Sequence, residues 1–461
     1  MSGDFTWSSA AEIAAAVASG KVSAGEVTEQ MLGVIDTRNP VLNAFTAVTA
    51  ERARKKAKAV DASPDKAKLP LAGVPFAVKN LFDVEGLPTV AGSKINRARK
   101  PAPHDAVLIE RMEAAGAVLI GALNMGEYAY DFTGENVHDG ASRNPHDTTR
   151  MSGGSSGGSG SAVGGGMVPL ALGSDTNGSI RVPSSLCGIF GLKPTYGRLT
   201  RARTFPFVAS LDHLGPFARS VRDLAISYDA MQGFDAEDAA CVDRTKESTA
   251  PFLEQGIDGL RVAVAGGYFR KGASPEALSA LDTVARSLNA RDIDIPEAAC
   301  ARAAAYVITT TEGAALHLDR LRRQANDFDP AVRDRLIAGA MVPSTLVVKA
   351  QNFRRWYRDA MLELFKDCDV ILAPATPVTA PKLGQVTFTL DGVDMPVRAN
   401  MGLYTQPISF IGLPVVAVPV PLKPLPIGVQ IIAAPWREDI ALRIAYALEK
   451  MGTVAAPRPN L

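Results

Sequence analysis

Serines that could carry chemistry are concentrated between residues 151 and 179, where two glycine-rich stretches flank a short apolar run at residues 168–172. A flexible linker is a poor interpretation, because the segment leads directly into an apolar run typical of a core strand. Glycines at such turns allow positive φ angles and a close approach of the backbone to a ligand. Ser179 follows the predicted strand and precedes a stretch that can form a helix, where free N–H groups could stabilise an oxyanion. Ser179 is therefore a candidate nucleophile.

Other kinds of catalytic site are disfavoured by the spacing of glycine, histidine and cysteine. The glycines match neither the dinucleotide-binding nor the P-loop pattern, which argues against a nucleotide site. Two overlapping G-x-S-x-G matches at residues 153–158 carry little information in so biased a segment, and a hydrolase of that type needs a late histidine, whereas the last one here is His317. The five histidines show no metal-binding spacing, and none of the four cysteines forms a C-x-x-C pair. We therefore expect no metal, no cofactor and no disulfide framework, which fits a reducing cytoplasm.

If no histidine serves as the base, another group must activate the serine, and Lys79 is the candidate. It ends an apolar run at residues 73–78 and is followed by more apolar residues. A lysine is rarely buried without a reason, and burial lowers its pKa, so that the amine can act as a general base near neutral pH. The alternative is a lysine at the end of a strand whose amine reaches water. This segment alone does not decide between the two.

Strands and helices alternate along the chain from residue 70 onward. Apolar runs predict strands at residues 74–82, 118–123, 168–172, 260–265, 370–372, 415–418 and 429–432. Further segments predict helices at residues 105–115, 275–288, 302–319 and 438–451. This alternation indicates an α/β fold in which helices cover both faces of a mostly parallel sheet. The short proline-containing loop between the last two strands predicts an antiparallel pair there, so we expect the sheet to be mixed.

The N-terminal part is predicted to be helical. Ser9 with Glu12 and Ser23 with Glu26 form capping-box patterns ahead of apolar periodicity. The basic run at residues 51–58 could bind nucleic acid, but a solvated helix face explains it better, because 49 Lys and Arg against 48 Asp and Glu leave a net charge of +1.

The sequence also argues against membrane targeting. The N-terminus lacks a basic-then-apolar signal pattern. Two long uncharged stretches, residues 151–174 and 399–422, are respectively too polar and too interrupted by proline to form membrane helices. We therefore expect a cytoplasmic protein that binds neither a membrane nor nucleic acid directly.

Several segments resemble the amidase signature family. The matching segments are residues 73–80, 152–159, 173–181, 187–198 and 426–432. Because they extend across nearly the whole chain, the resemblance is specific. It implies a single amidase domain over residues 1–461, with N-terminal helices at 1–65, a signature core at 66–225 and the rest of the core with substrate-specificity loops at 226–461. The implied fold is a mixed, mostly parallel β-sheet sandwiched between α-helices.

Carried over residue by residue, the resemblance implies a Ser–cis-Ser–Lys triad. Lys79 is then the base, Ser155 the bridging serine and Ser179 the nucleophile that forms an acyl-enzyme. The peptide bond between Gly154 and Ser155 is expected to be cis. The other implied site residues are Thr176, Asn177, Gly178 and Ser179 for the oxyanion hole, Ala129, Ser155 and Asn177 for substrate binding, and Ser156, Asp175 and Arg181 for support of the turn.

Two features of this implied site stay open. Many members of the family have glycine where Asn177 stands. Asparagine tolerates a positive φ angle, so the oxyanion hole can survive, and the side chain is either a specificity feature or a tolerated turn residue. The aromatic side chains in residues 128–132 either line the substrate pocket or belong to the core.

A closer resemblance, in residues 91–96, 124–138, 174–179 and 430–436, is to family members that release ammonia from a small urea-like amide, 1-carboxybiuret or biuret. It implies a hydrolase of linear amide C–N bonds in s-triazine degradation, a small helical partner subunit, and a homodimeric or hetero-oligomeric assembly. The alternatives are the amidase (A) subunit of a glutamine-dependent tRNA amidotransferase, a general aliphatic amidase, and a non-catalytic amidase-like scaffold. The intact triad positions disfavour the scaffold.

Overall fold

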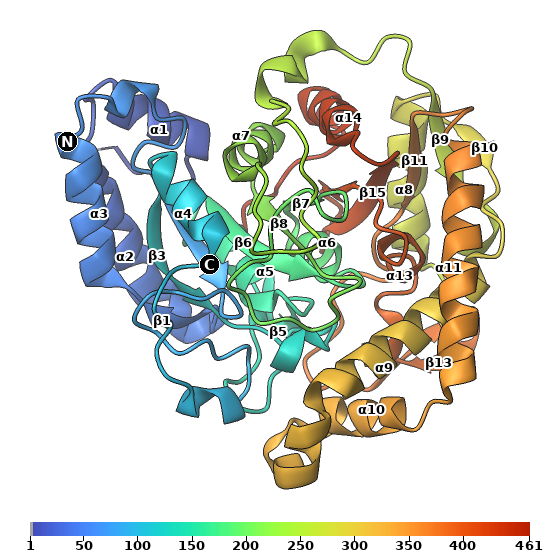
Figure 1. The fold of residues 1–461 in the computed structure, drawn as a ribbon. Helices are drawn as coiled ribbons and strands as arrows, with labels where there is room; N and C mark the ends of the chain where they lie inside the picture. Colours follow the sequence, from blue (N-terminus) through green and yellow to red (C-terminus); the bar gives the residue numbers. More distant parts are fainter. Residues whose placement is uncertain (1–2) are drawn as a thin grey trace.

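One large sheet organises the molecule. The structure is a computed structural model that describes residues 3–461. In this part of the chain, an 11-stranded sheet has the order β1-β3-β2-β6-β8-β7-β14-β15-β11-β9-β10, with helices packed around it (Figure 1). Two small two-stranded sheets, β4-β5 and β12-β13, lie outside it.

The strands of residues 3–461 are β1 Phe45–Val48, β2 Pro75–Lys79, β3 Val118–Leu123, β4 Arg143–Asn144, β5 Asp147–Met151, β6 Leu170–Asp175, β7 Phe190–Lys193, β8 His213–Ala218, β9 Val262–Ala265, β10 Arg291–Ile293, β11 Val370–Pro374, β12 Thr387–Leu390, β13 Val393–Pro396, β14 Val415–Val420 and β15 Ile427–Ala433. The α-helices are α1 Ala10–Ala18, α2 Ala24–Leu42, α3 Ala50–Ala62, α4 Val107–Ala114, α5 Gly157–Gly164, α6 Arg181–Cys187, α7 Val221–Met231, α8 Pro275–Ser287, α9 Ala298–Gln324, α10 Pro330–Ala340, α11 Ser344–Leu364, α12 Val397–Asn400, α13 Gln406–Ser409 and α14 Glu438–Lys450.

The sheet is mixed, as expected. Parallel pairs lie toward its two sides, where β2 pairs with β3 and β6, and β9 pairs with β10 and β11. The central strands β8, β7, β14 and β15 pair antiparallel with their neighbours. We expected mostly parallel pairing, and the structure has parallel pairs toward the sides of the sheet but not at its centre. The predicted antiparallel pair β14–β15 is confirmed. Its connection, residues 421–426, is too short for a parallel crossover.

Both predicted capping boxes are present. The Ser9 side chain accepts from the N–H of Glu12 at the start of α1, and the Ser23 side chain accepts from the N–H of Glu26 at the start of α2, with the reciprocal glutamate bonds in place. The basic run lies on α3, whose buried residues are Ala53, Ala57 and Val60. This supports its interpretation as the outer face of a helix.

The Gly/Ser-rich segment contains a helix that the sequence analysis did not predict. α5 consists of residues GGSGSAVG and is buried throughout. A Cβ atom on Gly158 would lie 2.5 Å from the Asn124 carbonyl oxygen and 2.6 Å from that of Ala44. The glycines are therefore required by close helix packing, which outweighs their low helix propensity.

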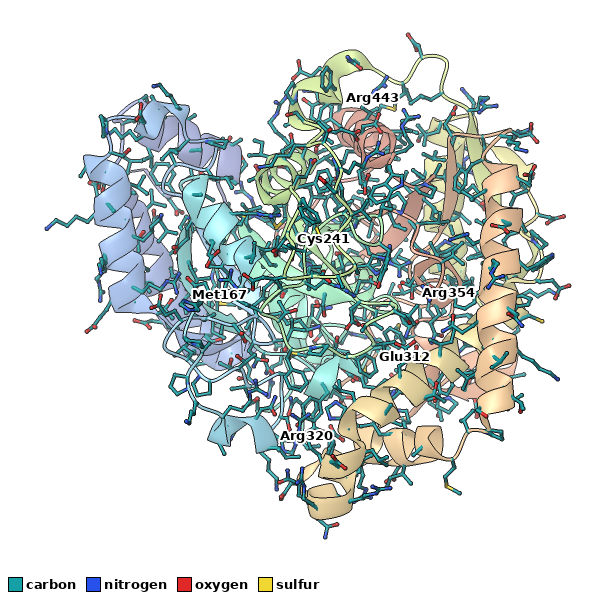
Figure 2. The ribbon with its side chains drawn as sticks, in the orientation of Figure 1. Met167, Cys241, Glu312, Arg320, Arg354 and Arg443 are labelled. Atoms are coloured by element: carbon teal, nitrogen blue, oxygen red, sulfur yellow. The ribbon has the colours of Figure 1, made fainter. Side chains whose placement is uncertain are left out.

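Helices α9, α10 and α11 form an arm on one side of the molecule (Figure 1). Two side chains that point inward, Glu312 on α9 and Arg354 on α11, tie this arm to the body (Figure 2). Glu312 accepts from the hydroxyl and N–H of Ser210, and Arg354 donates to the carbonyl oxygens of Ser210 and Phe410. α9 is thereby held where Thr309 contacts Asn177, in the turn that follows β6. Within residues 3–461, no helix is at once long enough and apolar enough to cross a bilayer.

The packing of α5 predicts opposite effects for two helical glycines. Gly158→Ala should destabilise the protein by about 1–3 kcal/mol, because its methyl group meets fixed backbone. Gly33→Ala, on the exposed side of α2 with nothing within 4 Å of its Cβ position, should be neutral or stabilise by up to about 1 kcal/mol. Thermal unfolding of both variants measures this, and an unchanged midpoint for Gly158→Ala would contradict the account of α5.

Candidate active site

Lys79 is the last residue of β2 and is completely buried. Because β2 lies between the parallel strands β3 and β6, the carboxyl ends of all three meet at one edge of the sheet. At this edge the Lys79 Nζ atom lies 2.7 Å from Ser155 Oγ and 2.8 Å from Ser174 Oγ. Burial lowers the pKa of the Lys79 amine to about 7, against the opposing charges of nearby aspartates. Of the two interpretations of Lys79, the structure therefore shows the buried amine and not the solvated one.

Ser155 is held directly before the start of α5. The Gly154–Ser155 peptide bond is cis, as expected. The Ser155 carbonyl oxygen accepts from the N–H of Gly126, and the N–H of Gly154 donates to Phe132. A Cβ atom on Gly154 would lie 2.3 Å from Asp131 Oδ2, so only glycine fits beside the serine. These contacts fix the Ser155 hydroxyl against Lys79.

Ser179 lies in the turn between β6 and α6, and a buried ion pair shapes this turn. Both oxygens of Asp175 accept from Arg181, at 3.0 Å each, and Asp175 Oδ2 also accepts from the N–H of Ile180 at 3.1 Å. Arg181 donates further to Gln430, and Ser409 donates to Asp175. Burial alone would raise the pKa of Asp175, but the charge and hydrogen bonds of Arg181 hold it well below its usual value. Asp175 and Arg181 thus support the turn, in the arrangement that the sequence analysis expected.

The backbone of this turn presents N–H groups to the cavity. Thr405 Oγ1 donates to the Asn177 carbonyl oxygen at 2.7 Å, which turns the N–H of Gly178 the opposite way. Among residues 3–461, the N–H groups of Asn177, Gly178 and Ser179 donate to no protein group. Gly178 has a φ angle of 143°, and a Cβ atom there would lie 2.2 Å from Thr405 Oγ1. In this turn Gly178, and not Asn177, has the positive φ angle. The tolerance of asparagine for that conformation is therefore not needed.

The Ser179 side chain faces a narrow cavity. Its lining residues are Ala129, Tyr130, Asp131, Phe132, Thr176, Asn177, Ser179, Phe207, Tyr306, Thr309, Arg335, Arg398, Ala399 and Gln406. Of the residues expected to contact the substrate, Ala129 and Asn177 line this cavity, whereas Ser155 does not. The aromatic residues divide between the two interpretations: Tyr130 and Phe132 line the cavity, and Tyr128 packs in the core against Phe205 and Phe328.

Two expected residues, Thr176 and Ser156, serve as supports. The Thr176 hydroxyl donates to Asp212 at 2.6 Å, and Asp212 also accepts from the N–H groups of Phe207 and Val208. The Ser156 hydroxyl donates to the Ser174 carbonyl oxygen at 3.1 Å and accepts from the Ser174 N–H at 3.3 Å. These bonds fix the strand end from which Ser174 reaches Lys79.

Sequence reasoning missed three residues: Ser174, Arg335 and Arg398. Ser174 binds the Lys79 amine, and its place at the end of β6 beside Asp175 was the available signal. Arg398 donates to Asp131 at 2.8 Å and lies 3.5 Å from Glu135. Arg335 donates to the Tyr130 and Ala331 carbonyl oxygens and stacks on the Tyr130 ring, and no carboxylate of residues 3–461 lies within ion-pair distance of it. No local pattern marks either arginine, because both reach the cavity only through the tertiary fold.

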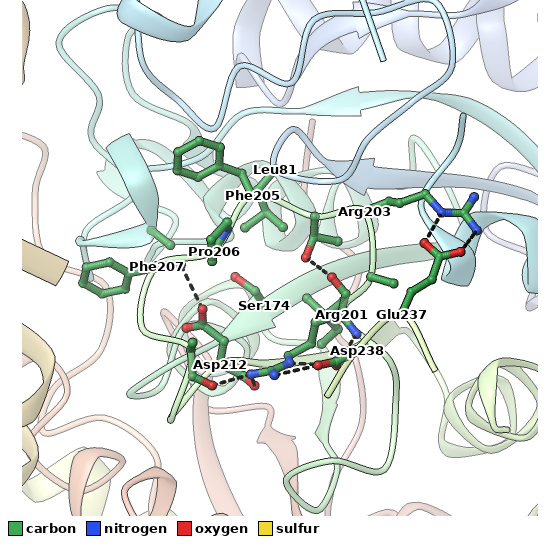
Figure 3. Close-up of a pocket in the computed structure, with 15 residues that line it drawn as sticks. Leu81, Ser174, Arg201, Arg203, Phe205, Pro206, Phe207, Asp212, Glu237 and Asp238 are labelled. Carbon is green, nitrogen blue, oxygen red and sulfur yellow. Dashed lines mark hydrogen bonds and ion pairs between the residues drawn. The ribbon is translucent and has the colours of Figure 1, made fainter. Parts of the chain in front are cut away.

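A larger cavity, of about 230 Å³, lies beside the first and shares Ala129 and Phe207 with it (Figure 3). Ser174 and Asp212 face it. Its other charged groups neutralise one another in the pairs Arg201–Asp238 and Arg203–Glu237. Ser179, the candidate nucleophile, lines the narrower cavity and not this one.

Comparison with known proteins agrees with this geometry. The model of the Amidase family matches residues 26–442. The chain belongs to the amidase signature family. This amidase is 53% identical to AtzE, a 1-carboxybiuret hydrolase subunit of Pseudomonas sp. (strain ADP), over 96% of this chain and 98% of that protein. It is 36% identical to the A-subunit of the glutamyl-tRNA(Gln) amidotransferase of Coxiella burnetii (strain Dugway 5J108-111), over 93% and 94% of the two chains.

Solved structures agree with the fold of this amidase. A chain from a vestigial protein complex of an s-triazine catabolic enzyme superimposes with a TM-score of 0.96 at 52% identity, covering 97% of this chain and 100% of that one. The 6-aminohexanoate cyclic dimer hydrolase superimposes with a TM-score of 0.88 at 30% identity, covering 99% of both chains. The family and these relatives make this amidase a hydrolase of linear amide C–N bonds.

The ion pair beneath the Ser179 turn predicts a large stability effect. Arg181→Met leaves the Asp175 carboxylate buried without a counter-charge and should cost about 3–5 kcal/mol. Arg54→Met removes a pair with Glu29 whose side chains are 53% and 54% exposed, and should cost far less, because water screens this pair. Urea unfolding of the two variants compares these losses, and similar small losses for both would show that the buried pair does not hold the turn.

Proposed function

We propose that this amidase hydrolyses the terminal amide of a small, anionic, urea-like substrate of the 1-carboxybiuret type and releases ammonia. The observation that carries the reaction is the buried Lys79 amine at 2.7 Å from Ser155 Oγ, with its pKa lowered to about 7. Near neutral pH a large fraction of this amine is uncharged, so it has a lone pair for a proton. Lys79, Ser155 and Ser179 then form the catalytic triad.

In the first half-reaction, the Ser155 hydroxyl gives its proton to Lys79 and takes the proton of Ser179. Ser179 Oγ attacks the amide carbon, and the carbonyl oxygen becomes an oxyanion. The free N–H groups of Asn177, Gly178 and Ser179, with that of Thr176, stabilise this charge, and losing one such donor typically costs about 3–4 kcal/mol. The C–N bond breaks as the proton returns from Lys79 through Ser155 to the nitrogen. Ammonia leaves, and an acyl-enzyme on Ser179 remains.

In the second half-reaction, water replaces ammonia. Ser155 takes a proton from water and passes its own proton to Lys79, and the resulting hydroxide attacks the ester carbon in the same oxyanion hole. The bond to Ser179 Oγ breaks, and the proton from Lys79 returns to that oxygen. The products are a free Ser179 and the acid of the acyl part.

The charge of the cavity supports an anionic substrate. Arg398 is neutralised by Asp131 and Glu135, whereas Arg335 faces the same cavity without a carboxylate partner. A guanidinium without a carboxylate partner, like that of Arg335, binds a carboxylate strongly through charge-assisted hydrogen bonds. A neutral amide such as biuret leaves Arg335 unmatched. We therefore favour a substrate with a carboxylate at the end remote from the scissile amide.

The relatives support the same choice. The 53% identity to the 1-carboxybiuret hydrolase chain exceeds the 36% identity to the amidotransferase chain. The superimposed s-triazine enzyme was solved as part of a protein complex. We include a partner subunit in the proposal, to be tested by co-purification of the chain with its co-expressed partner.

Ammonia release from 1-carboxybiuret, biuret, allophanate, glutamine and a simple aliphatic amide tests the proposal. We expect the highest kcat/KM for 1-carboxybiuret. Arg335→Met should lower that value by about 10- to 100-fold, the loss typical of a hydrogen bond to a charged group, and should change the value for biuret much less. Arg333→Met is the matched control, since Arg333 lies on the same helix and pairs with Asp334.

A preference for glutamine would overturn the proposed substrate and favour the amidotransferase alternative. An equal loss for charged and neutral substrates in Arg335→Met would overturn the role of Arg335. A protein inert toward every amide would overturn the proposed function as a whole.

A further inference from the structure

One buried acceptor in the catalytic cavity has no partner. Asn177 is 5% exposed and lines the cavity together with Ser179. Its Nδ2 atom donates to Thr309 Oγ1 on α9 at 2.8 Å, whereas its Oδ1 atom has no hydrogen-bond partner among residues 3–461. Buried polar atoms in native proteins nearly always have a hydrogen-bond partner. This unpaired acceptor therefore indicates a ligand that donates a hydrogen bond.

The position of Asn177 is fixed from two sides. Its backbone carbonyl oxygen accepts from Thr405, and its side chain is anchored to Thr309. The amide plane therefore cannot turn freely, and Oδ1 is the unpaired end of a side chain that lines the cavity. An anchored acceptor of this kind distinguishes ligands that have a hydrogen-bond donor from ligands that lack one, because it does not rearrange to suit the latter.

The mechanism indicates which part of the substrate meets this acceptor. The leaving nitrogen must face Ser155 and Lys79, which return its proton and are not among the residues that line the cavity. Residues that line the cavity beside Ser179 therefore contact the acyl part, on the other side of the scissile carbonyl. In a urea-like amide the atom next to that carbonyl is an N–H group, whereas in an aliphatic amide it is a CH₂ group.

This inference rests on the proposed function. We propose that Asn177 Oδ1 accepts a hydrogen bond from the N–H group in the acyl part of the substrate. The site thereby selects urea-like amides over carbon-chain amides. Thr309 is the positioning residue that holds the carboxamide in this orientation. The site thus combines a carboxylate anchor at Arg335 with a separate acceptor beside Ser179. Aliphatic amides of the same length fill the cavity but leave Oδ1 buried and unpaired, which is unfavourable.

Two stable probes isolate this hydrogen bond. 3-Ureidopropionate and glutaramate carry the same carboxylate, spacer length and terminal amide, and differ only by N–H against CH₂ next to the amide carbonyl. Calorimetry on the Ser179→Ala protein measures binding of each probe without turnover. We expect 3-ureidopropionate to bind about tenfold more tightly, the effect of one hydrogen bond inside a desolvated site.

Replacing the acceptor should remove this preference. In Ser179→Ala/Asn177→Leu, which keeps the side-chain size, the ratio of the two dissociation constants should fall to about one. Ser179→Ala/Thr309→Val should reduce the ratio in the same direction, and it keeps the test available if the leucine variant does not fold. Ser179→Ala/Thr311→Val is the control, because the Thr311 hydroxyl bonds only to its own helix, and its ratio should be unchanged.

Equal affinity for the two probes in Ser179→Ala would overturn the inference, as would a preference that survives in the leucine variant or failure of both probes to bind. These outcomes are independent of turnover. They are thus distinguishable from failure of the proposed function, which shows as absent ammonia release by the unsubstituted protein.

Discussion

The proposed chemistry depends on the removal of water from one lysine amine. Lys79 ends β2 at the point where three strand ends meet, and the only hydrogen bonds of its amine among residues 3–461 are to two serine hydroxyls. The nearby aspartates, Asp212, Asp175 and Asp131, oppose the effect of burial but do not cancel it. Each of these carboxylates is engaged elsewhere, in hydrogen bonds to the backbone or in pairs with arginine. The amine is therefore left with a pKa at which it can both take and return a proton.

The rest of the site keeps that arrangement rigid. The buried Asp175–Arg181 pair shapes the turn of Ser179, and Thr405 orients the peptide unit of the proposed oxyanion hole. Glycines stand where a side chain would collide, with Asp131 at position 154 and with Thr405 at position 178. Positions 154 and 158 therefore constrain the sequence through contact distances, and position 178 does so through both a contact distance and its positive φ angle. A preorganised site of this kind does not have to reorganise as charge develops.

Much of this could be predicted from local sequence. The caps at Ser9 and Ser23 are local patterns, and so is the antiparallel β14–β15 pair, since each depends on residues close together in the chain. The turn of Ser179 between a strand and a helix was equally visible. Lys79 could be put forward as a candidate base from its apolar surroundings, but its pairing with Ser155 required the family resemblance, because 76 residues separate the two.

The remainder could not be predicted because it depends on contacts between distant segments. α5 forms in a glycine-rich stretch only because Ala44 and Asn124 approach it closely. Arg335 lies in a stretch of α10 with several charged residues that resembles any surface helix, and the fold alone brings it to the cavity. The role of Asn177 likewise depends on Thr309, which is 132 residues away.

The pH dependence of kcat/KM for ammonia release tests the central claim most directly. Because burial lowers the pKa of Lys79 to about 7, the active, uncharged amine predominates above this pH and is protonated below it. We expect a plateau at alkaline pH and a fall of about tenfold per pH unit below about pH 7, as for a single essential base. An activity that stays level down to about pH 5, well below the pKa of such a base, would contradict the role of Lys79.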